Sequence, residues 1–307
     1  MNTLKTKIWE YVTGFLLIIG MLLGVTFFKD SDILLPEIAA MTAGMWIYHE
    51  DGWIREPRKI ITLPTITASI GFFINRTGLT YLEKVFLTTI FMLLILRIAK
   101  IYITPSLATG LFPIIVNSTH WSFLISIIIS TVILMSGVLI RGLHEQIQPA
   151  SKFNFKYQYV FLSIMTTWIF ITGFIGKPHM AAIPPIVVVF FEVLQKPVYP
   201  IKLVGKHIMV LTISATLGFV IHISISSWII SASIALPLIF ILLSFFKIRL
   251  PAAYAFPLLA LILPRDMFDT LPITVLVASL FFFNTAYFYK KYETKKAYSQ
   301  GEVYSKN

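Results

Sequence analysis

The sequence predicts an all-α polytopic membrane protein with about twelve transmembrane helices, organised as two parallel six-helix repeats. Of its 307 residues, 57% are hydrophobic and only 13% are charged, with a mean hydropathy of +0.83. A soluble domain carries about 25% charged residues. Apolar runs also recur along the whole chain, and no polar segment is long enough for a soluble domain. A third observation, an ordered similarity between the two halves of the chain, predicts the repeats.

Twelve apolar segments are candidate spans. They are residues 8–28, 33–49, 60–75, 83–99, 104–117, 120–140, 158–175, 178–194, 206–222, 227–246, 250–264 and 271–289. The first lacks a small-residue cleavage site, so we expect a helix there and not a signal peptide. A straight transmembrane helix takes about 20 residues, so segments 104–117 and 250–264 are too short to cross the membrane as ordinary helices. We expect these two to be short or broken helices, covered by protein or by a water-filled cavity.

The distribution of basic residues predicts the orientation. With twelve crossings and a cytoplasmic N-terminus, 20 of the 25 Lys and Arg residues lie inside. The five outside are Lys29, Arg76, Lys84, Lys177 and Arg265. This bias predicts a multi-pass protein of the cell (plasma) membrane with both termini in the cytoplasm. It also accounts for the net charge of +11 without a nucleic-acid partner.

Three ordered blocks of similarity relate the two halves. "PEIAAMTAG" (36–44) aligns with "PHMAAIPPI" (178–186), "TITASIGF" (65–72) with "TISATLGF" (212–219), and "ITPSLATGLFP" (103–113) with "RLPAAYAFP" (249–257). We therefore predict a first repeat over 1–143, a cytoplasmic linker over 144–157, a second repeat over 158–290, and a basic cytoplasmic tail over 291–307. Parallel repeats of this kind commonly place a substrate path between them.

Matched prolines and lysines are the first candidates for that path. Pro105 and Pro251 begin the two short segments, and a helix that starts inside the membrane presents N–H groups and a positive dipole end to an anion. The alternative is that proline is simply common in membrane helices. The lysines form two matched pairs, Lys59 with Lys206 and Lys100 with Lys247. They could form a cationic ring at the cytoplasmic mouth, which favours anions, or anchor the helices by snorkelling.

Ionisable residues inside the spans are the second group of candidates. Glu192 lies about one turn inside its helix end, His207 starts the next helix, and Glu37 and His179 occupy equivalent positions near the outer face. Such residues are functional candidates by default. All four lie near the ends of their spans, however, so a solvated or capping role is the alternative to a proton relay. We include Glu192 and His179 in the candidate path.

The residues give no support to an enzyme. The chain has no cysteine, and "HEQIQ" (144–148) lacks the second histidine of a zinc-binding H-E-x-x-H motif. It contains no G-x-S-x-G motif, no P-loop and no paired aspartates. We expect no catalytic residues, no cofactor and no metal.

Several stretches resemble HPP-type integral membrane proteins. "REPRKIITLPTITASIGFFI" resembles their "PRN…GG…SALIG" stretch, and "TPSLATGLFPIIV" resembles their "HPPAGATALLAV" segment. "NSTHWSFLI" is similar to the tryptophan-containing start of their last helix. The resemblance covers about residues 33–135, with a fainter echo over 178–285. Thr104-Pro105-Ser106 and Leu250-Pro251-Ala252 stand where His-Pro-Pro would be expected.

The resemblance implies an anion as the substrate. Plant and cyanobacterial members of the HPP family are associated with nitrite transport, although the missing histidine departs from their motif. The six-helix unit is more loosely similar to the membrane halves of fusaric-acid-resistance proteins, aromatic-acid exporters and aluminium-activated malate channels, which also move anions.

We therefore predict a transporter or channel for a small anion, either a nitrite-like inorganic anion or an organic or aromatic carboxylate. Its other partners would be membrane lipids, and a monomer or a homodimer would both fit a duplicated chain. The alternative is a non-transporting membrane protein that binds lipid or scaffolds an assembly. The position of the four lysines, at the path or at the lipid rim, would discriminate between the two.

Overall fold

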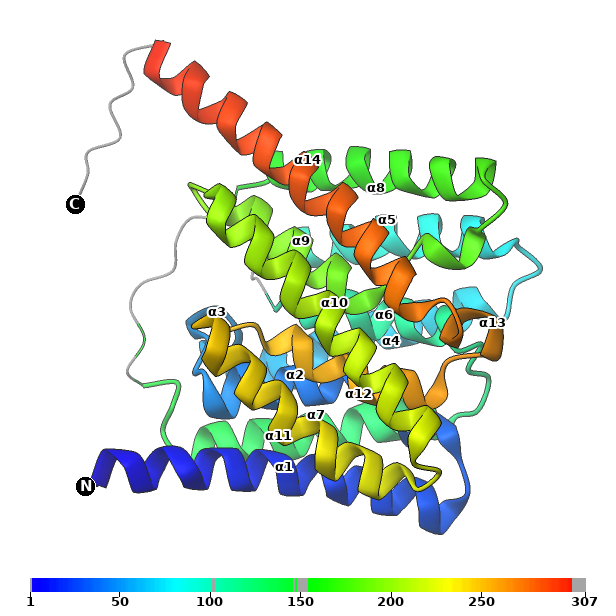
Figure 1. The fold of residues 1–307 in the computed structure, drawn as a ribbon, viewed down its shortest axis with the longest axis vertical. Helices are drawn as coiled ribbons and strands as arrows, with labels where there is room; N and C mark the ends of the chain where they lie inside the picture. Colours follow the sequence, from blue (N-terminus) through cyan, green and yellow to red (C-terminus); the bar gives the residue numbers. More distant parts are fainter. Residues whose placement is uncertain (1, 101–102, 146, 148–153, 300–307) are drawn as a thin grey trace.

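A computed structural model describes residues 2–100, 103–145, 147 and 154–299, and every regular element in these ranges is helical (Figure 1). The N-terminal half contains α1 (Asn2–Phe28), η1 (Ser31–Ile33), α2 (Pro36–Thr42), η2 (Ala43–Ile47), α3 (Asp51–Ile54), α4 (Pro57–Asn75), α5 (Tyr81–Ala99), α6 (Pro105–Ile115) and α7 (Ser122–Ile140). The C-terminal half contains α8 (Lys156–Phe174), η3 (Pro178–Met180), α9 (Pro184–Gln195), α10 (Ile201–Ser224), α11 (Trp228–Phe246), η4 (Pro251–Tyr254), α12 (Ala255–Ile262), α13 (Arg265–Phe268) and α14 (Leu271–Ser299). The predicted all-α class is confirmed.

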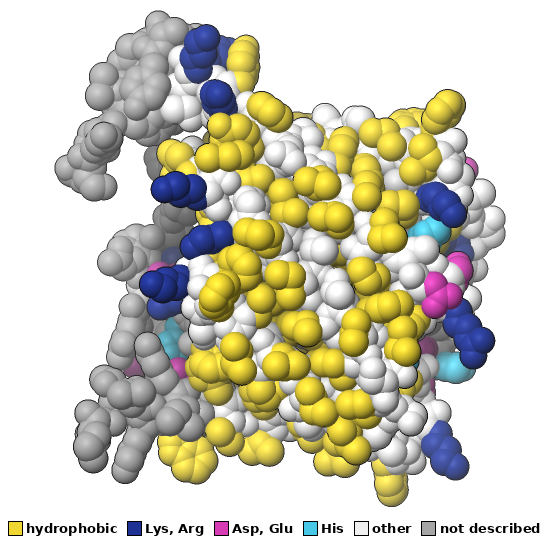
Figure 2. Space-filling view, viewed as in Figure 1, with side chains coloured by type: hydrophobic (Ala, Val, Ile, Leu, Met, Phe, Trp, Pro, Cys, Tyr) yellow, Lys and Arg dark blue, Asp and Glu magenta, His cyan; other side chains and the backbone are white. Residues whose placement is uncertain are grey.

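The length and surface of the helices identify a membrane protein. In the described chain, five segments are long and apolar enough to cross a membrane: Trp9–Phe28 in α1, all of α7, α10 and α11, and Leu271–Lys296 in α14. Hydrophobic side chains cover the middle of the face in Figure 2, whereas Lys, Arg, Asp and Glu gather along two opposite edges. Phe27 and Phe174 are 81% and 94% exposed. Such large exposed apolar surface is expected where lipid, and not water, is the solvent.

The two halves pack around short central helices. In the N-terminal half, α4 packs against α5, α6 and α7, and in the C-terminal half α10 packs against α11, α12 and α14. The contacts between the halves are equivalent in both directions. The first helix of the N-terminal half, α1, packs against α11, and the first helix of the C-terminal half, α8, packs against α5. In the centre, α2 packs against η4 and α12, and α9 packs against α6. The short helices are therefore enclosed by the long ones (Figure 1).

Each of the twelve predicted spans overlaps a helical segment, but four of them are short, not two. Besides α6 and the η4–α12 segment, the second segment of each half is short: residues 36–47 (α2 and η2) and α9. The physical reason is proline. Pro36 and Pro184 each occupy the first position of a helix, and the residues before them, Leu35 and Ile183, are extended. Proline disfavours helical backbone in the residue that precedes it.

A glycine in each half lets two helices approach closely. A Cβ atom at Gly71 in α4 would overlap the carbonyl oxygen of Gly110 in α6. A Cβ atom at Gly218 in α10 would lie 2.8 Å from Pro257 Cα in α12. These are backbone contacts that cannot be relieved by turning a side chain. Both short helices are therefore held tightly by their own half.

The two ends of the described chain lie on one side of the molecule. The N-terminal end of α1 and the C-terminal end of α14 lie on the side that carries α3, at the left of Figure 1, whereas α13 lies on the opposite side. We call these the α3 side and the α13 side. Parts of the predicted linker and tail, namely 146, 148–153 and 300–307, lie outside the described residues.

Candidate functional site

A chamber of about 400 Å³ lies between the two halves on the α3 side. Its walls come from the loop before α3, the start of α6, the end of α9 and the start of η4. The polar and charged residues that line it are Glu50, Thr104, Asn154, Tyr157, Glu192, Gln195, Lys196, His207 and Arg249. Two of the predicted path residues, Glu192 and Pro251, are therefore found in its wall.

Two carboxyl groups and two cations share this chamber. Glu192 of α9 accepts a hydrogen bond of 2.5 Å from the hydroxyl of Thr104, the residue before α6, so the bond joins the two halves. Burial raises the pKa of Glu50, and the cations of Lys196 and Arg249 act in the opposite direction. Both cations are exposed, and neither takes part in an ion pair or side-chain hydrogen bond in the described part of the chain. Their charge is available to an anion that enters the chamber.

A narrow seam continues from the chamber into the centre of the molecule. It encloses about 20 Å³, which is room for about one water molecule. Its walls are Pro36, Glu37, Ala40, Pro105, Ala108, Phe112, Pro184, Pro185, Val188, Ala252, Ala255 and Leu259. Chamber and seam use neighbouring residues of the same segments, such as Thr104 and Pro105. The seam is closed to anything larger than water in this conformation.

A third cavity extends the line towards the α13 side. It also encloses about 20 Å³, and it shares Pro184 and Leu259 with the seam. His179, a predicted path residue, lines it together with Met267 of α13. Chamber, seam and third cavity thus follow one another between the two halves.

Helix N-termini converge on the seam. The first residues of α2, α6 and α9 are Pro36, Pro105 and Pro184, and all three line it. The N-terminal end of a helix carries a partial positive charge, which favours a negative charge nearby. The free N–H donors expected at the proline-led helices are already engaged, since the N–H groups of Ser106 and Leu107 donate to the carbonyls of Ile103 and Thr104. The helix ends therefore act on an anion chiefly through their dipoles.

Glu37 is buried in this seam. Its side chain is only 3% exposed, and its Oε1 atom has no hydrogen-bond partner in the described chain. The sequence predicts a position near the outer face with water in reach, and this prediction is wrong. The reason is that α2 begins at Pro36 only after Leu34 and Leu35, which are fully buried. The chain has already entered the interior before the helix starts.

The four lysines lie at helix ends and outside the chamber wall. Lys59 Nζ donates to the carbonyl of Ala99 (2.9 Å) at the end of α5, and Lys206 Nζ donates to that of Phe246 (2.7 Å) at the end of α11. Lys100 and Lys247 cap the same two helices with left-handed backbone, at φ 53° and 51°. None of the four lines the chamber, although Lys247 borders a separate hollow beside Arg249. Their observed contacts cap helices.

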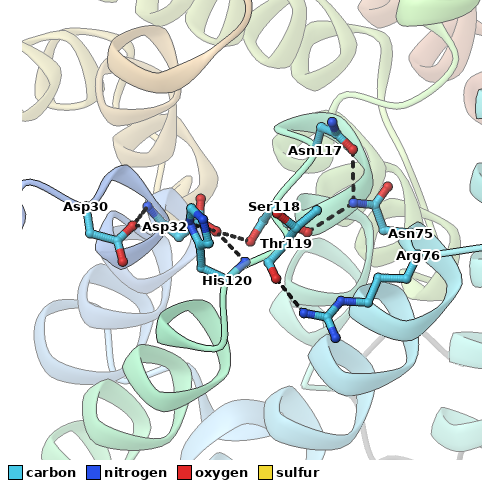
Figure 3. Close-up of polar contacts among 8 residues, drawn as sticks. All are labelled: Asp30, Asp32, Asn75, Arg76, Asn117, Ser118, Thr119 and His120. Carbon is cyan, nitrogen blue, oxygen red and sulfur yellow. Dashed lines mark hydrogen bonds and ion pairs between the residues drawn. The ribbon is translucent and has the colours of Figure 1, made fainter.

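A polar cluster on the α13 side was not singled out from the sequence (Figure 3). His120 Nδ1 lies 3.5 Å from Asp32 Oδ2 and 3.9 Å from Asp30 Oδ1, so three groups able to bind a metal come together. Asp32 also accepts a hydrogen bond from Ser118 Oγ (2.6 Å). Asn75 Nδ2 donates to the carbonyl of Ser118 (3.0 Å). Asp30 and Asp32 are a pair of aspartates that was overlooked in the sequence, and their Asp-x-Asp spacing was the available signal. The observed bonds tie the α1–α2 and α6–α7 connections to the end of α4.

No protein-family model, curated protein or solved structure gives a significant match to this chain. The resemblance to HPP-type proteins therefore stays a prediction. The fold shows a helical protein whose described residues include five segments long and apolar enough to cross a membrane, as in a membrane protein, and a line of cavities between its halves.

Proposed function

We propose that this protein is a membrane transporter or channel for a small anion, with a path between two parallel six-helix repeats. The observation that carries the proposal is the line of three cavities between the halves, with helix N-termini around its narrowest part. Positive helix ends inside a membrane are a means of holding an anionic group in transporters. Twelve crossings and two cytoplasmic termini in a plasma membrane belong to the same proposal.

Matched details support the duplication. The lysine-to-carbonyl bond of Lys59 recurs at Lys206, and the left-handed cap at Lys100 recurs at Lys247. The aligned blocks of sequence contain the equivalent glycines of α4 and α10, each of which packs against the short helix of its own half. A chance similarity in hydropathy would not repeat such bonds at equivalent positions. This pairing favours a path along the boundary between the repeats.

The chamber favours an anionic substrate. Lys196 and Arg249 line it without a carboxylate partner within ion-pair distance in the described chain. Its volume of about 400 Å³ is in the range of small-ligand sites. Both a nitrite-like ion and an aromatic carboxylate would fit in it.

Anion flux in proteoliposomes tests the proposal. We would measure nitrite, chloride and benzoate uptake for the wild type, Lys196→Gln, Arg249→Gln and the matched control Lys202→Gln, an exposed lysine that does not line the chamber. We expect saturable uptake, reduced roughly tenfold by either chamber variant, equivalent to ~1.4 kcal/mol of lost attraction. The control should behave like the wild type. Uptake no faster than in empty liposomes would argue against transport.

The double variant Lys59→Ala/Lys206→Ala separates the two interpretations of the lysines. A capping role predicts a lower melting temperature with flux per folded molecule retained. A cationic ring predicts reduced flux at unchanged stability. Thermal unfolding in detergent and flux at matched reconstitution measure the two effects independently.

The alternative function, lipid binding without transport, is favoured by a different observation. An apolar groove of about 680 Å³ lies between α1 and α7, lined by Leu16, Gly20, Ile125 and Ile129 among others. It is wide enough to hold lipid chains. Co-purified lipid that survives detergent exchange, together with absent flux, would favour this alternative.

A further inference from the structure

We propose that Glu37 is a proton-binding site that couples anion movement to proton movement in the same direction. This inference rests on the transport function proposed above. Glu37 lies in the seam, away from the cations of the chamber. Coupling at this residue would make the proton gradient the driving force for transport.

The surroundings of Glu37 provide the first step. Its carboxyl group lines the seam with apolar residues and prolines, and Oε1 has no hydrogen-bond partner in the described chain. Among the described residues, no Lys, Arg or His lines the seam. A carboxylate held there without a cation is unfavourable in a dry environment. A carboxyl group buried in this way is a functional candidate in a membrane protein.

The titratable groups on the neighbouring elements lie elsewhere. Of the elements packed against α2, the helices α6, α7 and α12 and the segment η2 contain no titratable residue. The segment η4 contributes Tyr254, and the part of α1 with described side chains contributes Glu10 and Tyr11. Tyr254 and Tyr11 interact with Tyr48, and Glu10 pairs with His49, at the far end of the α2–η2 segment. Across the seam, α9 contributes Glu192, which lines the chamber. Of the acidic side chains named here, the Glu37 carboxyl group is therefore the one that lies at the positive ends of α6 and α9.

The helix ends provide the second step. The N-termini of α6 and α9 point their positive ends at the seam from the two halves. When Glu37 is ionised, its own negative charge occupies this favourable position. A substrate anion that enters the same narrow space is then repelled by a like charge in a medium of low dielectric. When the carboxylate takes up one proton from water, it becomes neutral and the position is open to the anion.

One negative charge at a time then crosses the seam. The anion passes with the proton bound to Glu37, and the proton is released to water on the far side as the carboxylate reforms. For a monovalent anion the net charge moved is zero. Transport is consequently accompanied by acidification of the receiving side, and a membrane potential does not drive it.

The test uses wild-type protein and Glu37→Gln in proteoliposomes, with chloride and nitrite as probes. An internal pH dye reports proton entry, potassium with valinomycin sets the potential, and empty liposomes correct for leakage of nitrous acid. We expect wild-type uptake to acidify the lumen, to ignore the potential, and to rise by up to about tenfold per unit fall in external pH. In Glu37→Gln we expect uptake without acidification, and uptake that responds to the potential.

Glu83→Gln is the matched control. Glu83 is exposed in the capping box at the start of α5, and glutamine preserves such a box. It should retain coupling. Size-exclusion chromatography checks that Glu37→Gln is folded, and the wild-type measurement does not depend on any variant.

The outcomes separate this inference from the transport proposal. Wild-type protein that moves neither probe, nor benzoate in the flux measurement above, overturns the proposed function and this inference with it. Wild-type uptake that carries no protons and follows the potential overturns only the coupling. Coupling that persists in Glu37→Gln overturns the assignment to Glu37.

Discussion

Two carboxyl groups between the halves, those of Glu192 and Glu37, differ in the hydrogen-bond donors around them. Thr104 is 1% exposed and directs its hydroxyl at Glu192, so a buried donor of one half meets an acceptor of the other. Glu37 has no such donor for its Oε1 atom in the part of the chain that the structure describes. Two carboxyl groups at neighbouring cavities thus have different surroundings. One lines a wide chamber with polar walls, and the other lines a narrow seam whose walls are mostly apolar.

Glu50 offers a pH-dependent test at the residue scale. Burial raises its pKa. A carboxyl group whose pKa is raised by folding stabilises the fold fully below its unfolded value of about 4.3. That stability is lost as the pH rises through the folded value. We therefore expect Glu50→Gln to have a higher melting temperature than the wild type. The difference in melting temperature between the two proteins should grow from about pH 4 to about pH 7. Thermal unfolding at both pH values measures it, and a constant difference would contradict the prediction.

At the scale of elements, proline and glycine shape the centre of the molecule. Prolines begin α2, α6, α9 and η4, so these helices start inside the protein and turn their positive ends inwards. Glycines in α4 and α10 let α6 and α12 lie against their backbones. The long helices α1, α7, α10, α11 and α14 supply the apolar length that a membrane requires. Short helices line the cavities between the halves, and long helices surround them.

Substitution of the two glycines tests this packing. We expect Gly71→Ala and Gly218→Ala each to lower the free energy of unfolding by about 1–3 kcal/mol, because the added methyl group meets backbone atoms. Gly205→Ala, on the same helix as Gly218, is the matched control. A Cβ at Gly205 meets nothing within 4 Å, so this change should stabilise the helix by about 0.5–1 kcal/mol. Equal effects at Gly205 and Gly218 would contradict the close approach of α10 and α12.

At the scale of the whole molecule, the line of cavities is wide at one end only in the described chain. The chamber holds about 400 Å³ on the α3 side, whereas the seam and the third cavity hold about 20 Å³ each. An anion could therefore reach the chamber from the α3 side but could not pass the seam unless the halves move apart. If the α3 side is cytoplasmic, as we propose, this is an inward-facing state.

Cysteine labelling tests that orientation, because the chain has no cysteine of its own. We expect Gln195→Cys in the chamber to react with an impermeant maleimide only in inside-out vesicles. Lys177→Cys, in the loop after α8, should react in intact cells. Ala108→Cys in the seam should react in neither preparation. Labelling of Gln195→Cys in intact cells would reverse the proposed orientation.

The sequence by itself determined the all-helical class, the apolar character of the long helices and the approximate position of the helical segments. Hydropathy and helix length are local properties that need no knowledge of the packing partners. It also identified Pro105, Pro251 and Glu192 as candidates, since proline and an acid inside an apolar run are local anomalies. Only the tertiary structure decided that Glu37 is buried, that Lys59 and Lys206 bond to carbonyls, and that Lys196 and Arg249 line the chamber. Burial and pairing depend on residues about 40 or more positions away in the chain, which no local pattern encodes.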